Sequence, residues 1–436
     1  MNMKKNNSLP ANPTATSPAQ TARAFRGVTF TVCCTIGFAF AASAADWPQQ
    51  RGPNRDGKST ETGLLKEWPM GGLKPLWITE GLGDGYAGTS VVNGSIYTTG
   101  MTSNEIPQGV LYALDLSGKI QWEKPYGPAW NEMYPGTRAT PTVDGDRIYL
   151  LSGTGRLLCF NREDGEIVWS VDVVEKFGAV VQPCGFAEGI LIDGDKVVCT
   201  PGGPEASIVA VDKSKGETLW TTEGFGQQSA YCTPIVMERG GTRWMITITE
   251  KSVVAVDLET GEIGWTSPID VEDKFQNHSV SPVYENGMIY VTSGHGIGGQ
   301  MLQISPDGKQ VEQKWTDEAL KCLHGGLVLV EGYVYGASMS KKWVCLDLKS
   351  GEVMYESDGV GMGSVSYADG MLYCYGENGT LGLAKATPQG YELSGRTQVT
   401  HGGGNHWTHP VIADRRLYIR HGNALVAYDI GATPSS

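Results

Sequence analysis

Four of the seven histidines in this 436-residue chain occupy short loops, each of which precedes an apolar, strand-like segment. An arginine and a tyrosine occupy the same kind of position, which gives a set of six side chains: Arg138, Tyr231, His278, His324, His406 and His409. Neutral imidazoles bind transition metals such as zinc or copper. Arginine beside histidine can instead hold a carboxylate or sulfate group. The third alternative is a structural role, in which these side chains cap loops by bonding to backbone carbonyls. The sequence assigns no residue as catalytic and none as a metal ligand.

The segments around these loops repeat along the chain every 38 to 51 residues. Each repeat contains an apolar strand that ends in an Asp-like residue, then a tight glycine turn, then a strand that carries Trp. Residues 254–257, Gly261 and Trp265 form a clear copy. The Asp-like position recurs eight times, at residues 115, 161, 212, 257, 305, 347, 385 and 429. A period in this range indicates a propeller or a solenoid, because one unit cannot bury its own apolar face.

A second recurring signal lies between these copies. Dipeptides such as Asn93-Gly94 and Asp144-Gly145 stand between two apolar strands and supply the positive φ that a tight hairpin needs. Each repeat therefore predicts four antiparallel strands, and the fold class is an all-β, eight-bladed β-propeller, with seven blades as the alternative. The first Trp strand, at residues 75–77, should complete the last blade, whose own Trp strand is missing, and so close the ring.

Six tryptophans occupy equivalent positions in the repeats: Trp77, Trp122, Trp169, Trp220, Trp265 and Trp315. We interpret them as packing residues between blades, because a single binding site does not need six copies. Radial symmetry should also bring the loops before the innermost strands around one axis. A polar ligand site is therefore expected at the mouth of the central channel.

Residues 1–45 resemble a secretory signal peptide. They carry Lys4, Lys5, Arg23 and Arg26 with no acidic residue, then an apolar run at residues 28–42 and small residues suited to cleavage. The run is too short for a membrane span. We expect a lead-in segment at 46–74, the propeller at 75–430 and a tail at 431–436. The mature protein should be a periplasmic or secreted monomer.

Charge and cysteine content restrict the partners. Without residues 1–45 the chain keeps 30 basic and 47 acidic side chains, a net charge of −17 before histidines are counted. A surface with this excess of carboxylates repels phosphate backbones, which argues against nucleic acid as a partner. The seven remaining cysteines include no CxxC pair, so neither a zinc site nor a disulfide framework is indicated.

The repeat, as in residues 255–261 with Trp265, resembles the tryptophan-docking motif of the pyrroloquinoline quinone (PQQ)-like β-propeller family. The resemblance covers nearly the whole mature chain. Residues 47–54 also resemble the lead-in of exported bacterial members. The family includes quinoprotein dehydrogenases and the non-enzymatic propeller subunit of the outer-membrane barrel assembly machinery.

The resemblance implies a fold more strongly than an activity, because the motif is a packing device. The adjacent cysteine pair of the alcohol-oxidising members has its only counterpart at Cys33-Cys34, inside the predicted leader, and no CxxCH haem motif is present. We therefore predict an exported, non-enzymatic binding or scaffold module whose partner is an envelope protein or a small polar ligand. The alternatives are a PQQ- and Ca²⁺-dependent dehydrogenase of alcohols or sugars, and a subunit for outer-membrane protein assembly.

Overall fold

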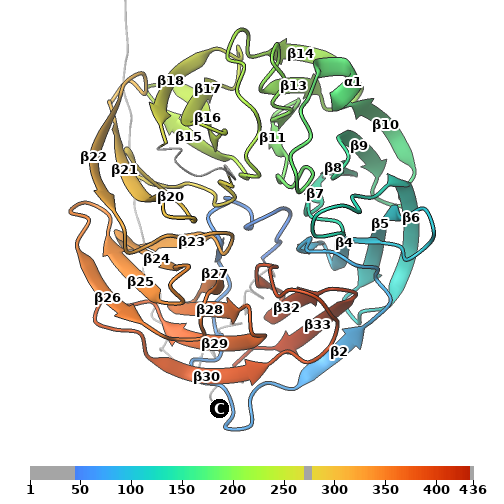
Figure 1. Ribbon diagram of the computed structural model, residues 1–436. Coiled ribbons are helices and arrows are strands. Elements are labelled where there is room, and N and C mark those ends of the chain that lie inside the picture. The colour runs from blue at the N-terminus through green and yellow to red at the C-terminus, as the bar shows by residue number, and fades with distance from the viewer. Residues whose placement is uncertain (1–44, 270–276, 433–436) are drawn as a thin grey trace, which may run out of the picture. The chain divides into compact units, whose positions relative to one another are not determined.

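The described residues form eight sheets arranged around a central channel. The computed structural model describes residues 45–269 and 277–432, and the predicted leader lies outside this part of the chain except for its last residue, Ala45. Seven sheets have four antiparallel strands, and one has an additional parallel strand at its inner edge. Figure 1 shows the ring along its axis. The prediction of an eight-bladed all-β propeller is confirmed, and the seven-bladed alternative is wrong.

In the first seven sheets the first strand in sequence lies innermost, because each blade is an antiparallel meander that runs outward. The first four sheets are β3 (Ser90–Val92), β4 (Ser95–Met101), β5 (Gln108–Asp115) and β6 (Ile120–Pro128); β7 (Thr142–Asp144), β8 (Arg147–Leu151), β9 (Arg156–Asn161) and β10 (Ile167–Asp172); β11 (Leu191–Asp193), β12 (Lys196–Cys199), β13 (Val209–Asp212) and β14 (Thr218–Thr221); β15 (Ile235–Arg239), β16 (Thr242–Ile248), β17 (Ser252–Asp257) and β18 (Ile263–Pro268). The next three are β19 (Val283–Glu285), β20 (Met288–Ser293), β21 (Gly298–Ile304) and β22 (Val311–Asp317); β23 (Leu327–Val330), β24 (Tyr333–Ala337), β25 (Trp343–Asp347) and β26 (Val353–Ser357); β27 (Gly363–Ala368), β28 (Met371–Gly376), β29 (Thr380–Lys385) and β30 (Leu393–Gln398).

The eighth sheet closes the ring with both ends of the propeller. It comprises β31 (Val411–Ala413), β32 (Arg416–His421), β33 (Ala424–Asp429) and, outermost, β2 (Pro75–Thr79). Strand β2 is antiparallel to β33, with Trp77 opposite Ala427. This is the closure that the sequence predicts, and it leaves neither terminal strand with an unpaired inner edge.

Each docking tryptophan lies on the glycine turn of the neighbouring sheet. The indole Nε1 donates to a backbone carbonyl oxygen there in five cases: Trp77 to Leu116 at 2.8 Å, Trp169 to Lys213 at 3.0 Å, Trp220 to Leu258 at 3.2 Å, Trp265 to Gly308 at 3.1 Å and Trp315 to Lys349 at 3.3 Å. The ring of Trp122 covers Gly165 in the same manner. Glycine is needed at this turn for two reasons, as Gly261 illustrates. Its φ is +79°, and an added Cβ would lie 2.6 Å from the Trp220 ring.

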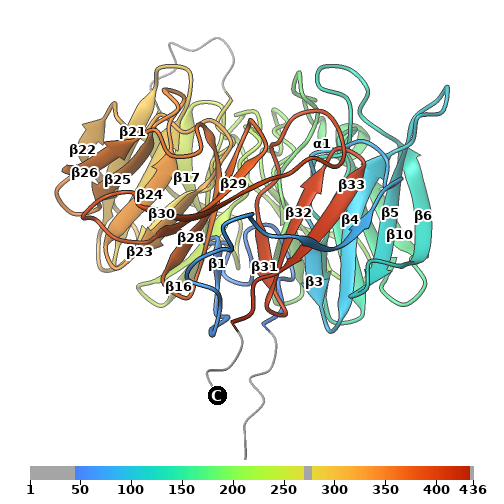
Figure 2. The same ribbon diagram turned by 90° about the horizontal axis from the view of Figure 1, so that it is seen from below.

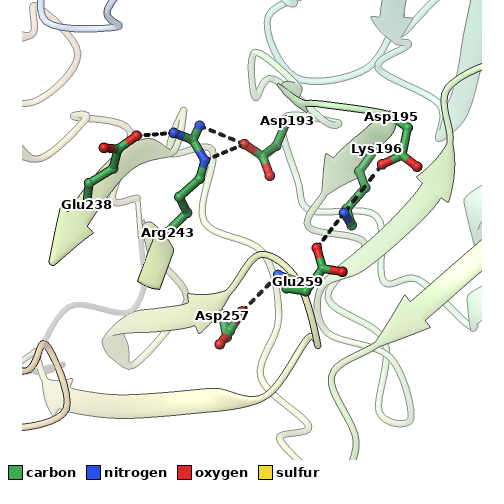
Figure 3. A network of polar contacts seen from close by, with 7 residues as sticks. All are labelled: Asp193, Asp195, Lys196, Glu238, Arg243, Asp257 and Glu259. Carbon is green, nitrogen blue, oxygen red and sulfur yellow. Dashed lines mark hydrogen bonds and ion pairs between the residues drawn. The ribbon is translucent and has the colours of Figure 1, made fainter. Parts of the chain in front are cut away.

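Charged side chains also connect two neighbouring sheets where their turns meet (Figure 3). Arg243 of β16 donates to Asp193 of β11 from Nε at 2.9 Å and from Nη2 at 2.7 Å. Lys196 of β12 contacts Glu259, which follows β17, at 2.9 Å. Such pairs are largely solvent-screened and contribute at most about 1 kcal/mol each. These pairs therefore contribute less to the contact between sheets than the buried indoles and the apolar side chains packed around them.

The meander gives the ring two distinct faces (Figure 2). Turns from the first to the second strand of each sheet lie on one face, and the ends of the described chain lie there too, since Asp46 accepts a hydrogen bond from Asn93 N at 2.9 Å. The opposite face carries the loops before the innermost strands, and we call it the mouth face. It includes the short helix α1 (Val173–Phe177), which begins at the N-cap Asp172 and ends at Gly178. None of the helices in the described residues is long and apolar enough to cross a membrane.

We expect Trp265→Ala to lower the free energy of unfolding by about 3–5 kcal/mol, because it removes a buried indole at a junction between sheets. Trp265→Phe keeps most of the ring and loses the bond to Gly308, so its cost should be about 1–2 kcal/mol. Urea denaturation measures both. The control is Leu219→Ala on the outer strand β14, where the side chain is 46% exposed and the change should be within about 0.5 kcal/mol. Equal losses in Trp265→Ala and the control would exclude the packing role.

Candidate site at the channel mouth

An aromatic cluster centred on Trp407 lies at the mouth face. The Trp407 ring is 4.9 Å from Tyr86, 5.0 Å from Tyr134 and 5.3 Å from His324, measured between ring centroids. These residues lie in the loops before β3, β7, β23 and β31, so four sheets bring them together. Among them Tyr134 is 47% exposed and presents its ring to solvent.

The carboxylate of Glu377, in the turn after β28, fixes this cluster from one side. Its Oε1 accepts hydrogen bonds from His324 Nε2 at 2.7 Å and from Trp407 Nε1 at 2.7 Å. Partial burial of Glu377 raises its pKa, but the contacts with His324 and Trp407 outweigh burial and leave the pKa below its ordinary value of 4.5. The carboxylate therefore stays charged at neutral pH and locks the indole in one orientation.

Arg138 lies on the other side of the cluster. Its guanidinium carbon is 5.4 Å from the centroid of the Tyr86 ring, which is cation–π geometry. Its Nε donates to Cys184 O at 2.5 Å, and its Nη2 donates to Met133 O at 2.8 Å and to Tyr134 O. Tyr231 supports this arrangement, because its hydroxyl accepts a bond from Cys184 N at 3.1 Å. Arg138, Tyr231 and His324 thus reach one mouth, as expected, and their ligand-binding role stays a prediction.

The three other predicted site residues are each bonded within the protein. His278 is fully buried, with Nδ1 2.9 Å from Ser293 Oγ and Nε2 3.3 Å from Glu250 O. His409 Nε2 donates to His324 O at 3.1 Å, and burial is the main cause that lowers its pKa to about 3. His406 stacks on His421 with ring centroids 3.7 Å apart, and burial followed by the charge of His421 lowers its pKa to about 4. The imidazoles therefore make separate contacts with the protein and do not converge on one point.

Residues 47–59, which we call the plug, fill the channel beneath the mouth. Figure 1 shows this segment in blue inside the ring. Trp47 exchanges backbone hydrogen bonds with Val91 of β3 at 2.7 and 2.9 Å. The plug ends in β1 (Lys58–Ser59), which pairs in parallel with β27 as the fifth strand of that sheet. The sequence indicated a lead-in segment here but gave no signal that it would occupy the channel.

Two arginines hold the plug in place, and each is only 2% exposed. Arg55 Nη1 donates to Gly189 O at 2.9 Å and to Pro234 O at 3.3 Å, and its Nη2 donates to Ile190 O. Arg51 Nη2 donates to Leu327 O. Burial lowers the pKa of both guanidinium groups to about 10, so both stay charged at neutral pH. Their acceptors are Leu327 O, in the innermost strand β23, and the carbonyl oxygens of Gly189, Ile190 and Pro234, which precede β11 and β15.

Three residues of the mouth escaped prediction from the sequence: Tyr86, Trp407 and Glu377. Trp407 offered a usable signal, because it stands outside the six docking positions and next to His406 and His409. Glu377 and Tyr86 offered none, since a single Glu before a turn and a single Tyr before a strand are common surface features.

The side chains at the mouth do not form a binding site for a quinone cofactor with its Ca²⁺ ion. Ca²⁺ takes about six to eight oxygen ligands, usually several from carboxylates. Glu377 is the carboxylate that bonds to the cluster, and its Oε1 already accepts two hydrogen bonds. In residues 45–269 and 277–432, no group of three or more His, Cys, Asp or Glu side chains has metal-binding geometry. The seven cysteines described there are free thiols.

Eight radial sheets, joined by indoles on neighbouring glycine turns, define a PQQ-like β-propeller. The chain belongs to the family described as outer membrane protein assembly factor BamB, which matches residues 107–357. This finding confirms the resemblance seen in the sequence.

Individual relatives are distant. The assembly factor BamB of Salmonella typhimurium is 24% identical over 293 residues, covering 64% of this chain and 71% of that protein. The crystal structure of BamB from Moraxella catarrhalis has a TM-score of 0.60 and 16% identity, and it covers 82% of this chain and 99% of that one. Quinohemoprotein alcohol dehydrogenase from Comamonas testosteroni has a TM-score of 0.66 and 12% identity, with coverage of 89% and 81%. Since both solved structures are so dissimilar in sequence, these two likenesses establish the fold and not the activity.

We expect Arg55→Ala to lower the free energy of unfolding by at least about 3 kcal/mol, because three carbonyl oxygens lose a charged donor inside the channel. Arg396→Ala, at an exposed position of β30, is the matched control and should change stability by less than about 0.5 kcal/mol. Thermal and urea unfolding measure both variants. A plug that contributes nothing to stability would give the same result at the two positions.

Glu377→Gln should reduce stability at neutral pH by less than about 1 kcal/mol, since the carboxylate that accepts the hydrogen bonds from His324 and Trp407 is partly exposed to solvent. The lowered pKa of Glu377 sets the sign: its stabilisation is present above pH 4.5 and disappears as the pH falls through the folded-state pKa. The difference between wild type and variant should therefore be larger at pH 7 than at about pH 3. Urea denaturation at the two pH values measures it, and a difference independent of pH would contradict the charge assignment.

Proposed function

We propose that this protein is a non-catalytic scaffold for outer-membrane protein assembly, which binds an envelope protein on its mouth face. Membership of the BamB family supports a role in outer-membrane protein assembly. The observation that carries the binding face is the set of exposed apolar side chains in its loops: Ile106 at 71%, Met133 at 49%, Tyr134 at 47%, Val180 at 37% and Met339 at 36%. Apolar and aromatic side chains that surround a polar centre are typical of protein-binding surfaces.

The channel contents support a surface role in preference to a role inside the ring. The plug and its buried arginines occupy the space below the mouth, so a partner on this face meets a closed platform. A dehydrogenase would require a cofactor site, and the donor set around Glu377 does not fit calcium with a quinone. A scaffold function therefore explains the plug and the side chains of the mouth better than a dehydrogenase function does. We also make the partner more specific than the sequence did: a protein of outer-membrane protein assembly.

Site-specific crosslinking in the native bacterium tests this proposal. A photoreactive amino acid at Tyr134 or Met339 on the mouth face should crosslink to one envelope protein in stoichiometric yield. The same label at Leu219, an exposed apolar side chain on the outer strand β14, is the matched control and should give no such product. Deletion of the gene should also lower the levels of several outer-membrane β-barrel proteins. Normal levels after deletion, with no product at either mouth position, would refute the scaffold function.

A further inference from the structure

The Arg138 guanidinium is a cation that this acidic chain leaves without a counter-charge. All of its hydrogen bonds go to backbone carbonyl oxygens, those of Met133, Tyr134 and Cys184. Within the described part of the chain, no carboxylate lies within ion-pair distance of it, and no acceptor is bonded to its Nη1. The whole chain has a net charge of −13, so carboxylates are plentiful elsewhere. Partly buried charges are usually paired. The buried Arg51 and Arg55 also donate only to carbonyl oxygens, but they lie inside the channel, whereas Arg138 lies at the mouth face and is therefore the candidate anion site.

The surrounding backbone holds this cation in a fixed place at a conformational cost. Tyr134 has φ +52° and Tyr231 has φ +65°, both in the left-handed region that bulky side chains seldom adopt. The Tyr134 carbonyl accepts from Arg138, and the Tyr231 hydroxyl supports Cys184, whose carbonyl also accepts from Arg138. Strained residues of this kind concentrate at functional sites, where neighbouring contacts enforce them. Two of them therefore support one guanidinium.

An aromatic wall adjoins the cation. The Tyr86 ring lies against the guanidinium, Trp407 lies against Tyr86, and Tyr134 meets Trp407 edge-on at an interplanar angle of 70°. Glu377 fixes Trp407 through its Nε1, so the wall is ordered before any partner arrives. A small inorganic anion would use the guanidinium alone. A peptide with an acidic and an aromatic side chain would use both parts, and rigid Trp, Tyr and Arg side chains dominate binding energy in protein interfaces.

We propose that the mouth binds a peptide segment of a partner protein that places a carboxylate on Arg138 and an adjacent aromatic side chain against Tyr86, Tyr134 and Trp407. This deepens the proposed function and rests on its assumption that the partner is a protein. The carboxylate supplies the missing counter-charge, through a charge-assisted hydrogen bond that guanidinium geometry favours. The aromatic side chain covers the exposed ring of Tyr134.

Four matched octapeptides with capped ends and a Gly/Ser background test the proposal with the mature protein. Their central pairs are Phe-Asp, Phe-Asn, Ala-Asp and Ala-Asn, and fluorescence polarisation measures their affinities. We expect the Phe-Asp peptide to bind at least about tenfold more tightly than either single replacement, which is about 1.4 kcal/mol. Because these comparisons vary only the peptide, they need no protein variant. Equal binding of Asp and Asn peptides, or no binding of any of the four, would overturn the proposal.

Protein variants then assign the two halves of the site. Arg138→Gln should abolish the preference for Asp over Asn and keep the preference for Phe over Ala, whereas Trp407→Ala should do the reverse. Arg138→Lys keeps the charge and should retain part of the Asp preference, and Arg396→Gln is the surface control with no effect. If inorganic sulfate competed as well as the Phe-Asp peptide, the site would be an anion site only, and the peptide assignment would be wrong.

The outcome is separable from that of the proposed function. Peptide preferences in vitro do not depend on the pathway, so they can hold even if gene deletion leaves outer-membrane proteins unchanged. Conversely, crosslinking at Tyr134 without any preference for Phe-Asp would retain the scaffold and refute this peptide chemistry. Analytical ultracentrifugation tests whether the partner is a second copy of this chain. A dimer that dissociates when the Phe-Asp peptide is added would show that the mouth binds its own chain, which would contradict a different protein as the partner.

Discussion

The contact on which the ring depends is the indole of one sheet lying on the glycine turn of the next. A four-stranded blade is too small to bury its own apolar faces, and its stability comes from its two neighbours. The indole covers the turn, and in five cases its Nε1 donates to a backbone carbonyl there. Repetition of one geometry at successive junctions keeps the sheets at similar angles. The inner loops of all sheets are thereby directed to one face.

Packing between neighbouring sheets does not join the two ends of the ring. It also provides no hydrogen-bond partners for the backbone groups at the inner edges of the sheets. Pairing of β2 with β33 joins the ends, since it makes the last blade from both termini. The plug provides partners at the inner edges. Arg51 and Arg55 bond to carbonyl oxygens beside β23, β11 and β15, across the channel from one another. The same segment joins the inner strands of several sheets and occupies the channel below the mouth.

The mouth is consequently a surface of loops with the plug directly beneath it. Its rings come from loops of different sheets, and each loop is anchored to a rigid strand, so their positions follow from the geometry of the ring. Glu377 links Trp407 to His324, and Arg138 donates its hydrogen bonds to carbonyl oxygens and lies against Tyr86. A platform ordered in advance loses little conformational entropy on binding, which suits a scaffold. An acidic protein that presents an unpaired guanidinium beside aromatic rings at its mouth face offers a partner both charge and shape.

The sequence by itself determined the repeat, the eight sheets, the closure by Trp77 and the positions of the docking tryptophans. These features are periodic patterns, with a period of two within strands and of about 45 residues between blades. Such patterns can be recognised in the linear sequence without knowledge of the fold. It also placed Arg138, Tyr231 and His324 near one axis, because symmetry carries that information. Only the tertiary structure decided that His278 is buried, that Glu377 and Trp407 order the mouth and that residues 47–59 fill the channel. Those contacts join residues as far apart as Arg55 and Gly189, separated by 134 positions, or Arg51 and Leu327, separated by 276. No local propensity encodes such pairs, since they exist only once the ring has closed.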